Sequence, residues 1–193
     1  MLNHQNNKLA APGAGIIAFT RTHLGEVKVL LSRRAESVGE GFGITGGGFV
    51  ECGDVFSSPV GTVVPLTHEA YREGVEENPG FDKVISRDEF NRRARHLTSF
   101  AVRTDDANGV HVATYYGLEL DKGEFEKVAA LPPSDERVGD LIVADLSWTS
   151  ESLQASTPEA QINMEGMDRF YHQHELYAFV ALAKLLERDL YKP

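Results

Sequence analysis

Glycine is concentrated in one segment of this 193-residue chain: seven of its 18 glycines fall within residues 38–54, VGEGFGITGGGFVECGD. Such a backbone can turn sharply, and other groups can approach it closely, because no side chain stands in the way. Four apolar residues are interleaved with these glycines: Phe42, Ile44, Phe49 and Val50. A flexible linker rarely carries that much apolar surface. We therefore interpret the segment as an ordered glycine-rich loop, with an exposed flexible loop as the alternative.

A helix is predicted after this loop, from about Pro65 or Leu66 to Asn78, where the sequence Asn-Pro-Gly ends it. One stripe of the helix carries four carboxylates, spaced at i, i+4, i+7 and i+8: Glu69, Glu73, Glu76 and Glu77. Neighbouring carboxylates repel one another, whereas a hard divalent cation such as Mg²⁺ or Mn²⁺ takes oxygen ligands. The stripe favours a metal site, with a solvated acidic face as the alternative. Glu69 either extends the metal cluster or is solvated.

Together, the loop and the helix resemble the signature of the Nudix hydrolase family. That signature is Gly, five residues, Glu, seven residues, then Arg-Glu-U-x-Glu-Glu-x-Gly-U, where U is a bulky aliphatic residue. Residues 48–54 (GFVECGD) match the first part, residues 72–77 (REGVEE) match the second, and Gly80 lies at its end. The resemblance covers about residues 14–81, whereas residues 98–148 share only the order of strands.

The chain departs from the signature at four places. Ten additional residues, 55–64, separate the two halves, Asp54 replaces a glutamate, Gly74 replaces an aliphatic residue, and Pro79 is inserted before the closing glycine. All carboxylates of the Arg-Glu-x-x-Glu-Glu core are retained. We expect the insertion to be an irregular loop near the substrate pocket, held at both ends by its valines, with residues 57–61 as its tip.

The resemblance implies an α/β fold of the Nudix type, an α/β/α sandwich around a mixed β-sheet with a long C-terminal helix. It also implies a hydrolase that depends on Mg²⁺, or on Mn²⁺. Such an enzyme cleaves the pyrophosphate bond of a nucleoside diphosphate linked to another moiety, as in ADP-ribose-like compounds or nucleotide sugars. The alternative is a Nudix-like module that binds or senses a nucleotide without turnover.

The resemblance also assigns roles to individual residues. It places the metal on three carboxylates of the helix: Glu73, Glu76 and Glu77. Glu76 and Glu77 are also the expected catalytic residues, together with Arg72, which holds a glutamate of the signature by a charge-assisted hydrogen bond. The backbone of Gly47 and Gly48 approaches the metal or a phosphate. The general base is either a glutamate of the helix or an acid on a later loop, where we prefer Glu136 to Asp135.

Local patterns predict the remaining elements. Strands are expected over residues 16–20, 27–32, 98–103, 110–120 and 141–146. A capping-box pattern at residues 86–89 opens a basic helix that extends to about Leu97, and residues 149–166 are loop-like. An amphipathic helix is expected over residues 167–190, with the following core residues: Phe170, Leu176, Phe179, Val180, Ala183 and Leu186.

Two weaker signals have both a functional and a structural interpretation. The basic helix and the residues after it either meet a substrate phosphate or form a solvated face: Arg87, Arg92, Arg93, Arg95 and His96. Three aromatic side chains either stack on a nucleobase or pack in the core: Tyr115, Tyr116 and Trp148.

Composition restricts the cellular setting and the partners. The chain has 19 Lys and Arg against 29 Asp and Glu, and this net charge of −10 disfavours stable binding to nucleic acid. It contains no apolar run long enough for a membrane span, and its single cysteine, Cys52, fits a reducing compartment. We expect a cytoplasmic protein with one domain over residues 13–193, after a loose lead-in at residues 1–12. Its expected partners are a small nucleotide substrate and, through the C-terminal helix, a second copy in a homodimer.

Overall fold

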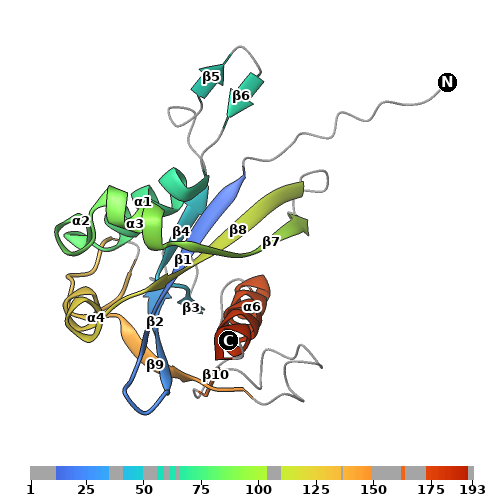
Figure 1. Cartoon of the computed structure of the whole chain (residues 1–193). Coiled ribbons are helices and arrows are strands. Elements are labelled where there is room, and N and C mark those ends of the chain that lie inside the picture. Colours follow the sequence, from blue (N-terminus) through green and yellow to red (C-terminus); the bar gives the residue numbers. More distant parts are fainter. Residues whose placement is uncertain are drawn as a thin grey trace.

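The structure is a computed structural model that describes residues 12–34, 41–49, 56–58, 61–63, 66–103, 110–135, 137–148, 162–163 and 173–190. A mixed β-sheet forms the middle layer, with helices on both of its faces (Figure 1). The predicted α/β/α sandwich is therefore confirmed.

The main sheet has eight strands, six of which lie in the order β10-β9-β2-β1-β8-β7, while β3 pairs with β2 and β4 pairs with β1. Strands β1 and β8 are parallel, and the other pairs are antiparallel. Their bounds are β1 Gly13–Arg21, β2 Val27–Arg34, β3 Gly41–Gly43, β4 Gly46–Phe49, β7 Arg95–Arg103, β8 Val110–Glu119, β9 Ile142–Leu146 and β10 Ile162–Asn163.

Both faces of the sheet are buried, and each has its own apolar core. Successive side chains of β1 point to opposite faces: Ile16 packs in one core, and Ile17 packs in the other. The first core is covered by α1 Leu66–Glu77, α2 Phe81–Val84, α3 Arg87–Arg93 and α4 Lys122–Ala129. Helix α6, Gln173–Leu190, covers the second core. Because β1 is buried on both sides, its sequence is apolar or small almost throughout and shows little alternation.

The structure corrects three predictions about the elements. Helix α3 ends at Arg93, not at about Leu97, because Ala94 is extended and the following residues already pair with β8. Helices α2 and α4 were not predicted, although the capping box of Asp121 and Glu124 was a readable signal for α4.

The third correction concerns the insertion, which is not an irregular loop. Strands β5 Phe56–Ser58 and β6 Gly61–Val63 form an antiparallel pair in which Phe56 lies opposite Val63. This two-stranded sheet projects from the body of the fold next to the start of α1 (Figure 1). The aromatic and β-branched residue types of the insertion favour strands, and the antiparallel pairing of the two strands outweighs the turn-forming residues between them.

The C-terminal helix is confirmed over the residues that the structure describes. The predicted core residues of α6 that it contains are buried: Leu176, Phe179, Val180, Ala183 and Leu186. Residues 167–172, with the predicted core residue Phe170, lie outside the described residues, as do residues 1–11 of the expected lead-in.

Helix α6 is joined to the glycine-rich segment by a buried carboxylate. Glu175 accepts a hydrogen bond from the backbone N–H of Ile44 at 3.1 Å, and the hydroxyl of Ser32 donates to the carbonyl of Ile44 at 2.7 Å. Burial raises the pKa of Glu175 to about 8, although the hydrogen bond from Ile44 and the charge of Arg34 act in the opposite direction. Glu175 is therefore protonated at neutral pH in the folded protein.

This protonation predicts a pH-dependent stability. Between the ordinary pKa of 4.5 and the raised pKa of about 8, the folded chain holds a proton that the unfolded chain has lost. The free energy of unfolding then falls as the pH rises, by at most about 1.4 kcal/mol per pH unit for this one group. In urea unfolding from pH 5 to pH 8, Glu175→Gln is expected to reduce this slope while keeping an acceptor for Ile44. The matched substitution Glu126→Gln, at an exposed position of α4, serves as the control. Equal slopes for both variants would contradict the raised pKa of Glu175.

Candidate active site

Helix α1 lies unusually close to the sheet because glycines face each other across the contact. A Cβ at Gly74 would lie 2.8 Å from Cδ1 of Ile16, and a Cβ at Gly46 would lie 3.2 Å from Cα of Gly74. The departure of Gly74 from the signature therefore has a packing reason, since an aliphatic side chain would require the buried side chain of Ile16 or helix α1 to shift. The close contact compensates for the cost of glycine within a helix.

Asn78 fixes the end of α1 against the glycine-rich segment. Its buried side-chain amide donates to the carbonyls of Thr45 at 2.9 Å and Gly74 at 3.2 Å. The hydroxyl of Thr45 in turn donates to the carbonyl of Leu30 at 2.8 Å and accepts from the N–H of Ala18 at 2.9 Å. These bonds hold α1, β1, β2 and the start of β4 in one register.

The guanidinium of Arg72 contacts three of the four glutamates of the carboxylate stripe. It donates to Glu69 through Nη2 and, at 3.3 Å, through Nε. It also donates to Glu73 through Nη2, and to Glu76 through Nη1 at 2.5 Å. The predicted role of Arg72 as a holder of glutamates agrees with this geometry. The hydrogen bonds that Arg72 donates to Glu69 and Glu76, together with the charges of Glu73 and Glu69, raise the pKa of Arg72, and burial opposes this shift. The hydrogen bond to Glu69 contributes most.

The three carboxylates around Arg72 differ in their exposure to solvent. The side chain of Glu69 is fully buried, that of Glu73 is 12% exposed, and that of Glu76 is 56% exposed. The solvated alternative for Glu69 is therefore wrong. Burial raises the pKa of Glu73 to about 8, and the charge of Arg72 opposes this shift.

Gly47 and Gly48 of strand β4 have different neighbours. A Cβ at Gly48 would overlap the carboxylate of Glu73, whereas a Cβ at Gly47 would lie 3.1 Å from Cα of Gly15. Gly48 therefore brings the backbone of the glycine-rich segment directly against a predicted metal ligand. Gly47 permits β4 to pack closely on β1.

The donor set on α1 suits a hard divalent cation in its chemistry. The Glu73 carboxylate occupies the space that a side chain at position 48 would fill, so the absence of a Cβ at Gly48 permits its present position. However, within the described part of the chain, no three His, Cys, Asp or Glu side chains already converge as a metal site. Glu73 and Glu76 contact Arg72 instead, so metal binding requires the guanidinium to give up both of them.

The preferred general base, Glu136, lies outside the described residues. Its neighbour Asp135 is exposed, whereas Arg137 is buried, and Arg137 was missed by sequence reasoning. Nη2 of Arg137 donates to the carbonyls of Leu131 at 2.8 Å and Pro132 at 2.7 Å, while Nε and Nη1 have no hydrogen-bond partner among the residues that the structure describes. Burial lowers the pKa of Arg137, and the charges of Asp140 and Glu77 oppose this shift. Arg137 thus brings a cation close to Glu77, and no sequence pattern indicates this.

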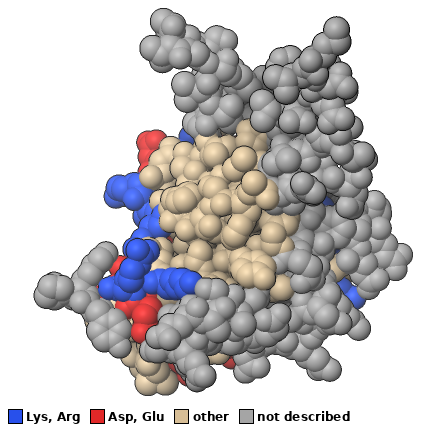
Figure 2. All heavy atoms as spheres, turned by 90° about the vertical axis from the view of Figure 1, so that its right-hand side faces the viewer, with Lys and Arg blue, Asp and Glu red and all other residues tan. Residues whose placement is uncertain are grey.

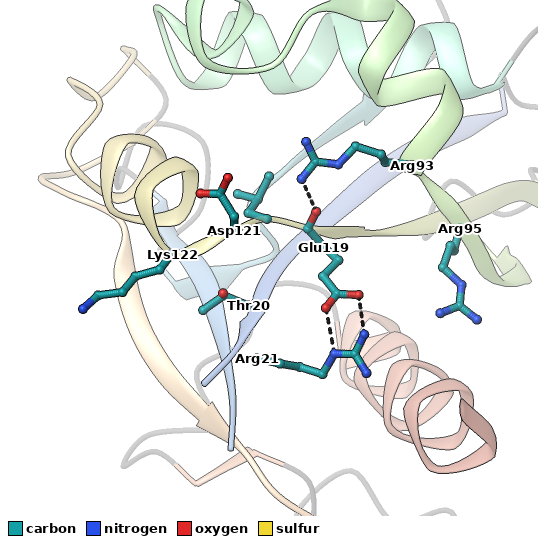
Figure 3. Close-up of a pocket in the computed structure, with 8 residues that line it drawn as sticks. Thr20, Arg21, Arg93, Arg95, Glu119, Asp121 and Lys122 are labelled. Atoms are coloured by element: carbon teal, nitrogen blue, oxygen red, sulfur yellow. Dashed lines mark hydrogen bonds and ion pairs between the residues drawn. The ribbon is translucent and has the colours of Figure 1, made fainter. Parts of the chain in front are cut away.

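Three arginines of the predicted basic segment after α1 form contacts within the fold. An open cavity of about 540 Å³ has Arg93 and Arg95 among its lining residues. Figure 3 shows these side chains. Arg93 donates to both carboxylate oxygens of Glu124, at 2.8 and 2.6 Å, and Arg95 forms an ion pair with Asp189 at 2.5 Å. The guanidinium of Arg87 lies 5.6 Å from the ring centre of Tyr71. These contacts join α3 to α4 and to α1, and they join β7 to α6. They favour the structural interpretation of these three arginines.

The three aromatic candidates for base stacking pack within the protein. Tyr115 and Tyr116 are buried on opposite faces of β8. Trp148 is partly buried against the core under α6, and its indole N–H donates to Glu187 at 2.6 Å. Their contacts favour the core interpretation.

Comparison with solved structures defines the fold. A MutT/Nudix family protein from Enterococcus faecalis aligns with a TM-score of 0.61 at 15% identity, over 92% of this chain and 62% of that protein. An Ap4A hydrolase from C. elegans, solved as a binary complex, aligns with a TM-score of 0.53 at 10% identity, over 93% of this chain and 99% of that protein. NrtR of Shewanella oneidensis, solved with a 27mer DNA, aligns with a TM-score of 0.51 at 16% identity, over 92% of this chain and 63% of that protein.

These likenesses show that the chain has the Nudix fold, as the motif resemblance implied. The chain spans less than two thirds of the length of the E. faecalis protein and of NrtR. No protein-family model and no curated protein matches the sequence itself. Among the described helices, none combines the length and hydropathy that a membrane span requires.

Proposed function

We propose that this chain is a Mg²⁺-dependent pyrophosphohydrolase that cleaves a nucleoside diphosphate linked to a further moiety. The observation that carries the proposal is the placement of Arg72, Glu73 and Glu76 on one stripe of α1, with the backbone of Gly48 against Glu73. The Nudix fold and the retained Arg-Glu-x-x-Glu-Glu sequence support it. ADP-ribose-like compounds and nucleotide sugars are the proposed substrates.

Each residue has a proposed part in the reaction. Glu73, Glu76 and Glu77 hold the divalent cation, which when bound polarises the phosphate and lowers the pKa of the attacking water. Arg72 holds the glutamates of α1 by charge-assisted hydrogen bonds before the cation binds. Gly47 and Gly48 leave the backbone accessible to a phosphate. The attacking water loses its proton to Glu136 or, in the alternative, to a glutamate of α1.

A nucleotide-sensing module without turnover is the second candidate. It is favoured by the contacts of Glu73 and Glu76 with Arg72, because a permanent arginine would prevent metal binding. The likeness to NrtR, which was solved with DNA, also allows a regulatory role at the level of the fold. We place this candidate second because a pure sensor has no chemical reason to keep all three carboxylates.

The proposed partners follow from the sequence. A small nucleotide remains the proposed ligand, and stable nucleic-acid binding remains disfavoured by the net charge of −10. On the face shown in Figure 2, the described residues are mainly uncharged, and Lys and Arg gather along one margin. This distribution differs from the broad basic surface that binds a phosphate backbone. A cytoplasmic location and a homodimer through α6 also remain proposals.

A panel of nucleotides separates the two candidates. We expect phosphate-containing products from at least one nucleoside diphosphate linked to another moiety, with Mg²⁺ or Mn²⁺ present and not with EDTA. The panel contains ADP-ribose, nucleotide sugars, dinucleoside polyphosphates and oxidised nucleoside triphosphates, and products are measured by chromatography. Binding of a nucleotide without metal-dependent turnover would support the sensor instead.

A further inference from the structure

The buried carboxylate of Glu69 has no assigned role in the proposed reaction, although it makes the most extensive contact with Arg72. Both of its oxygens accept from the guanidinium, one from Nη2 and the other from Nε at 3.3 Å. Glu73 and Glu76 each accept through a single oxygen. The guanidinium edge formed by Nε and Nη2 therefore faces Glu69.

Burial determines which of these contacts can be broken. An ionised carboxylate without solvent contact is stable only when it is paired and hydrogen-bonded. The side chain of Glu69 has 0% exposure, so its pairing with Arg72 is obligatory. The side chain of Glu76 is 56% exposed and can be hydrated when Arg72 releases it. Glu73 is intermediate, and its release is compensated if a cation takes the place of Arg72.

We propose that Glu69 is a positioning residue that anchors Arg72 and thereby frees Glu73 and Glu76 for a divalent cation. This inference rests on the proposed metal-binding function. Glu69 neutralises the guanidinium when the other two carboxylates leave it, so Arg72 is not left as an uncompensated buried charge. Without Glu69, the guanidinium loses its most extensive carboxylate contact, binds Glu73 and Glu76 more tightly and competes with the metal for them.

The test is Mn²⁺ binding by calorimetry, at one fixed pH, for wild type, Glu69→Leu, Arg72→Met and the double variant. We expect Glu69→Leu to weaken Mn²⁺ binding by about tenfold or more, as the loss of a supporting group behind metal ligands typically does. The double variant Glu69→Leu with Arg72→Met is expected to recover affinity close to wild type, because the competing guanidinium is gone. Replacing a buried ion pair by apolar residues of similar volume usually preserves the fold.

A matched pair elsewhere in the chain controls for general effects. Arg93 and Glu124 also form a two-pronged, partly buried ion pair, but on α3 and α4. Glu124→Leu is expected to lower the melting temperature and leave Mn²⁺ affinity unchanged. If Glu69→Leu does not fold, as shown by circular dichroism, Glu69→Gln replaces it in the same comparison.

Three results would overturn the proposed role of Glu69 as the anchor of Arg72. Weak Mn²⁺ binding in both the single and the double variant would make Glu69 a metal ligand. Unchanged Mn²⁺ binding by folded Glu69→Leu would leave it a purely structural residue. Absence of Mn²⁺ binding by the wild-type chain would overturn the proposed metal-dependent function and the anchor with it. Normal wild-type binding with either of the first two results overturns the anchor alone.

Discussion

Glu77→Gln is expected to reduce turnover of the best nucleotide substrate by at least about a hundredfold while the chain stays folded. Glu77 lies at the end of α1, where its charge acts on both Glu73 and Arg137. The substitution removes one negative charge from the proposed metal site and keeps the size of the side chain. The measurement is kcat with saturating Mg²⁺, together with the shift in melting temperature that Mn²⁺ produces in each variant.

Glu126→Gln is the control for loss of an acidic residue, because Glu126 is exposed on α4 and pairs only loosely with Lys122, at 3.8 Å. We expect its kcat and its melting response to Mn²⁺ to equal those of wild type. A Glu77→Gln variant with wild-type kcat would remove Glu77 from the catalytic machinery. If Glu77→Gln keeps the Mn²⁺ response but loses turnover, Glu77 acts on the attacking water and not on the metal.

Gly48→Ala is expected to abolish most of the activity, because the new methyl group would occupy the place of the Glu73 carboxylate. Either the glycine-rich segment or the side chain of Glu73 must then move. Because the overlapping atoms are the end of a flexible side chain, the expected cost in stability is small. The larger expected effect is on geometry, since Glu73 is displaced from the proposed metal site. Nucleotide hydrolysis and Mn²⁺ binding are measured on the same preparation.

Gly123→Ala is the matched control for the added methyl group. Gly123 lies in the first turn of α4, where a Cβ meets Asp121 Oδ1 at an ordinary 3.4 Å. Alanine is the better helix former, so this variant is expected to be at least as stable as wild type and fully active. Full activity and normal Mn²⁺ binding in Gly48→Ala would show that the Glu73 carboxylate does not need its position against Gly48.

Sequence reasoning succeeded where a feature depends on residues close together in the chain. The capping box of Ser86 and Glu89 is local, and the structure contains it. The helix bearing the carboxylates was predicted for the same reason, since its spacing and its Asn-Pro-Gly end lie within 15 residues. Local rules failed for β5 and β6, where strand pairing decided between a loop and a hairpin.

The candidate site shows the same division. The spacing of Glu69, Glu73 and Glu76 in the sequence places them on one stripe of α1, and the sequence alone determined this placement. Their unequal exposure was decided by the tertiary structure, in which the side chain of Glu69 is completely buried and that of Glu76 is 56% exposed. The place of Arg137 near Glu77 also depends on folding, since these residues are far apart in the chain.

The amino-acid sequence by itself therefore determined the fold class, the helix that carries the carboxylates and the glycines that approach it, because periodicity, capping and backbone freedom act over short distances. Only the tertiary structure decided which carboxylate is buried with Arg72, which glycine lies against Glu73, and which cation lies near Glu77. These features depend on how closely α1 approaches the sheet. That distance is determined by side chains from β1, β4 and α1 together, which no single segment of the sequence specifies.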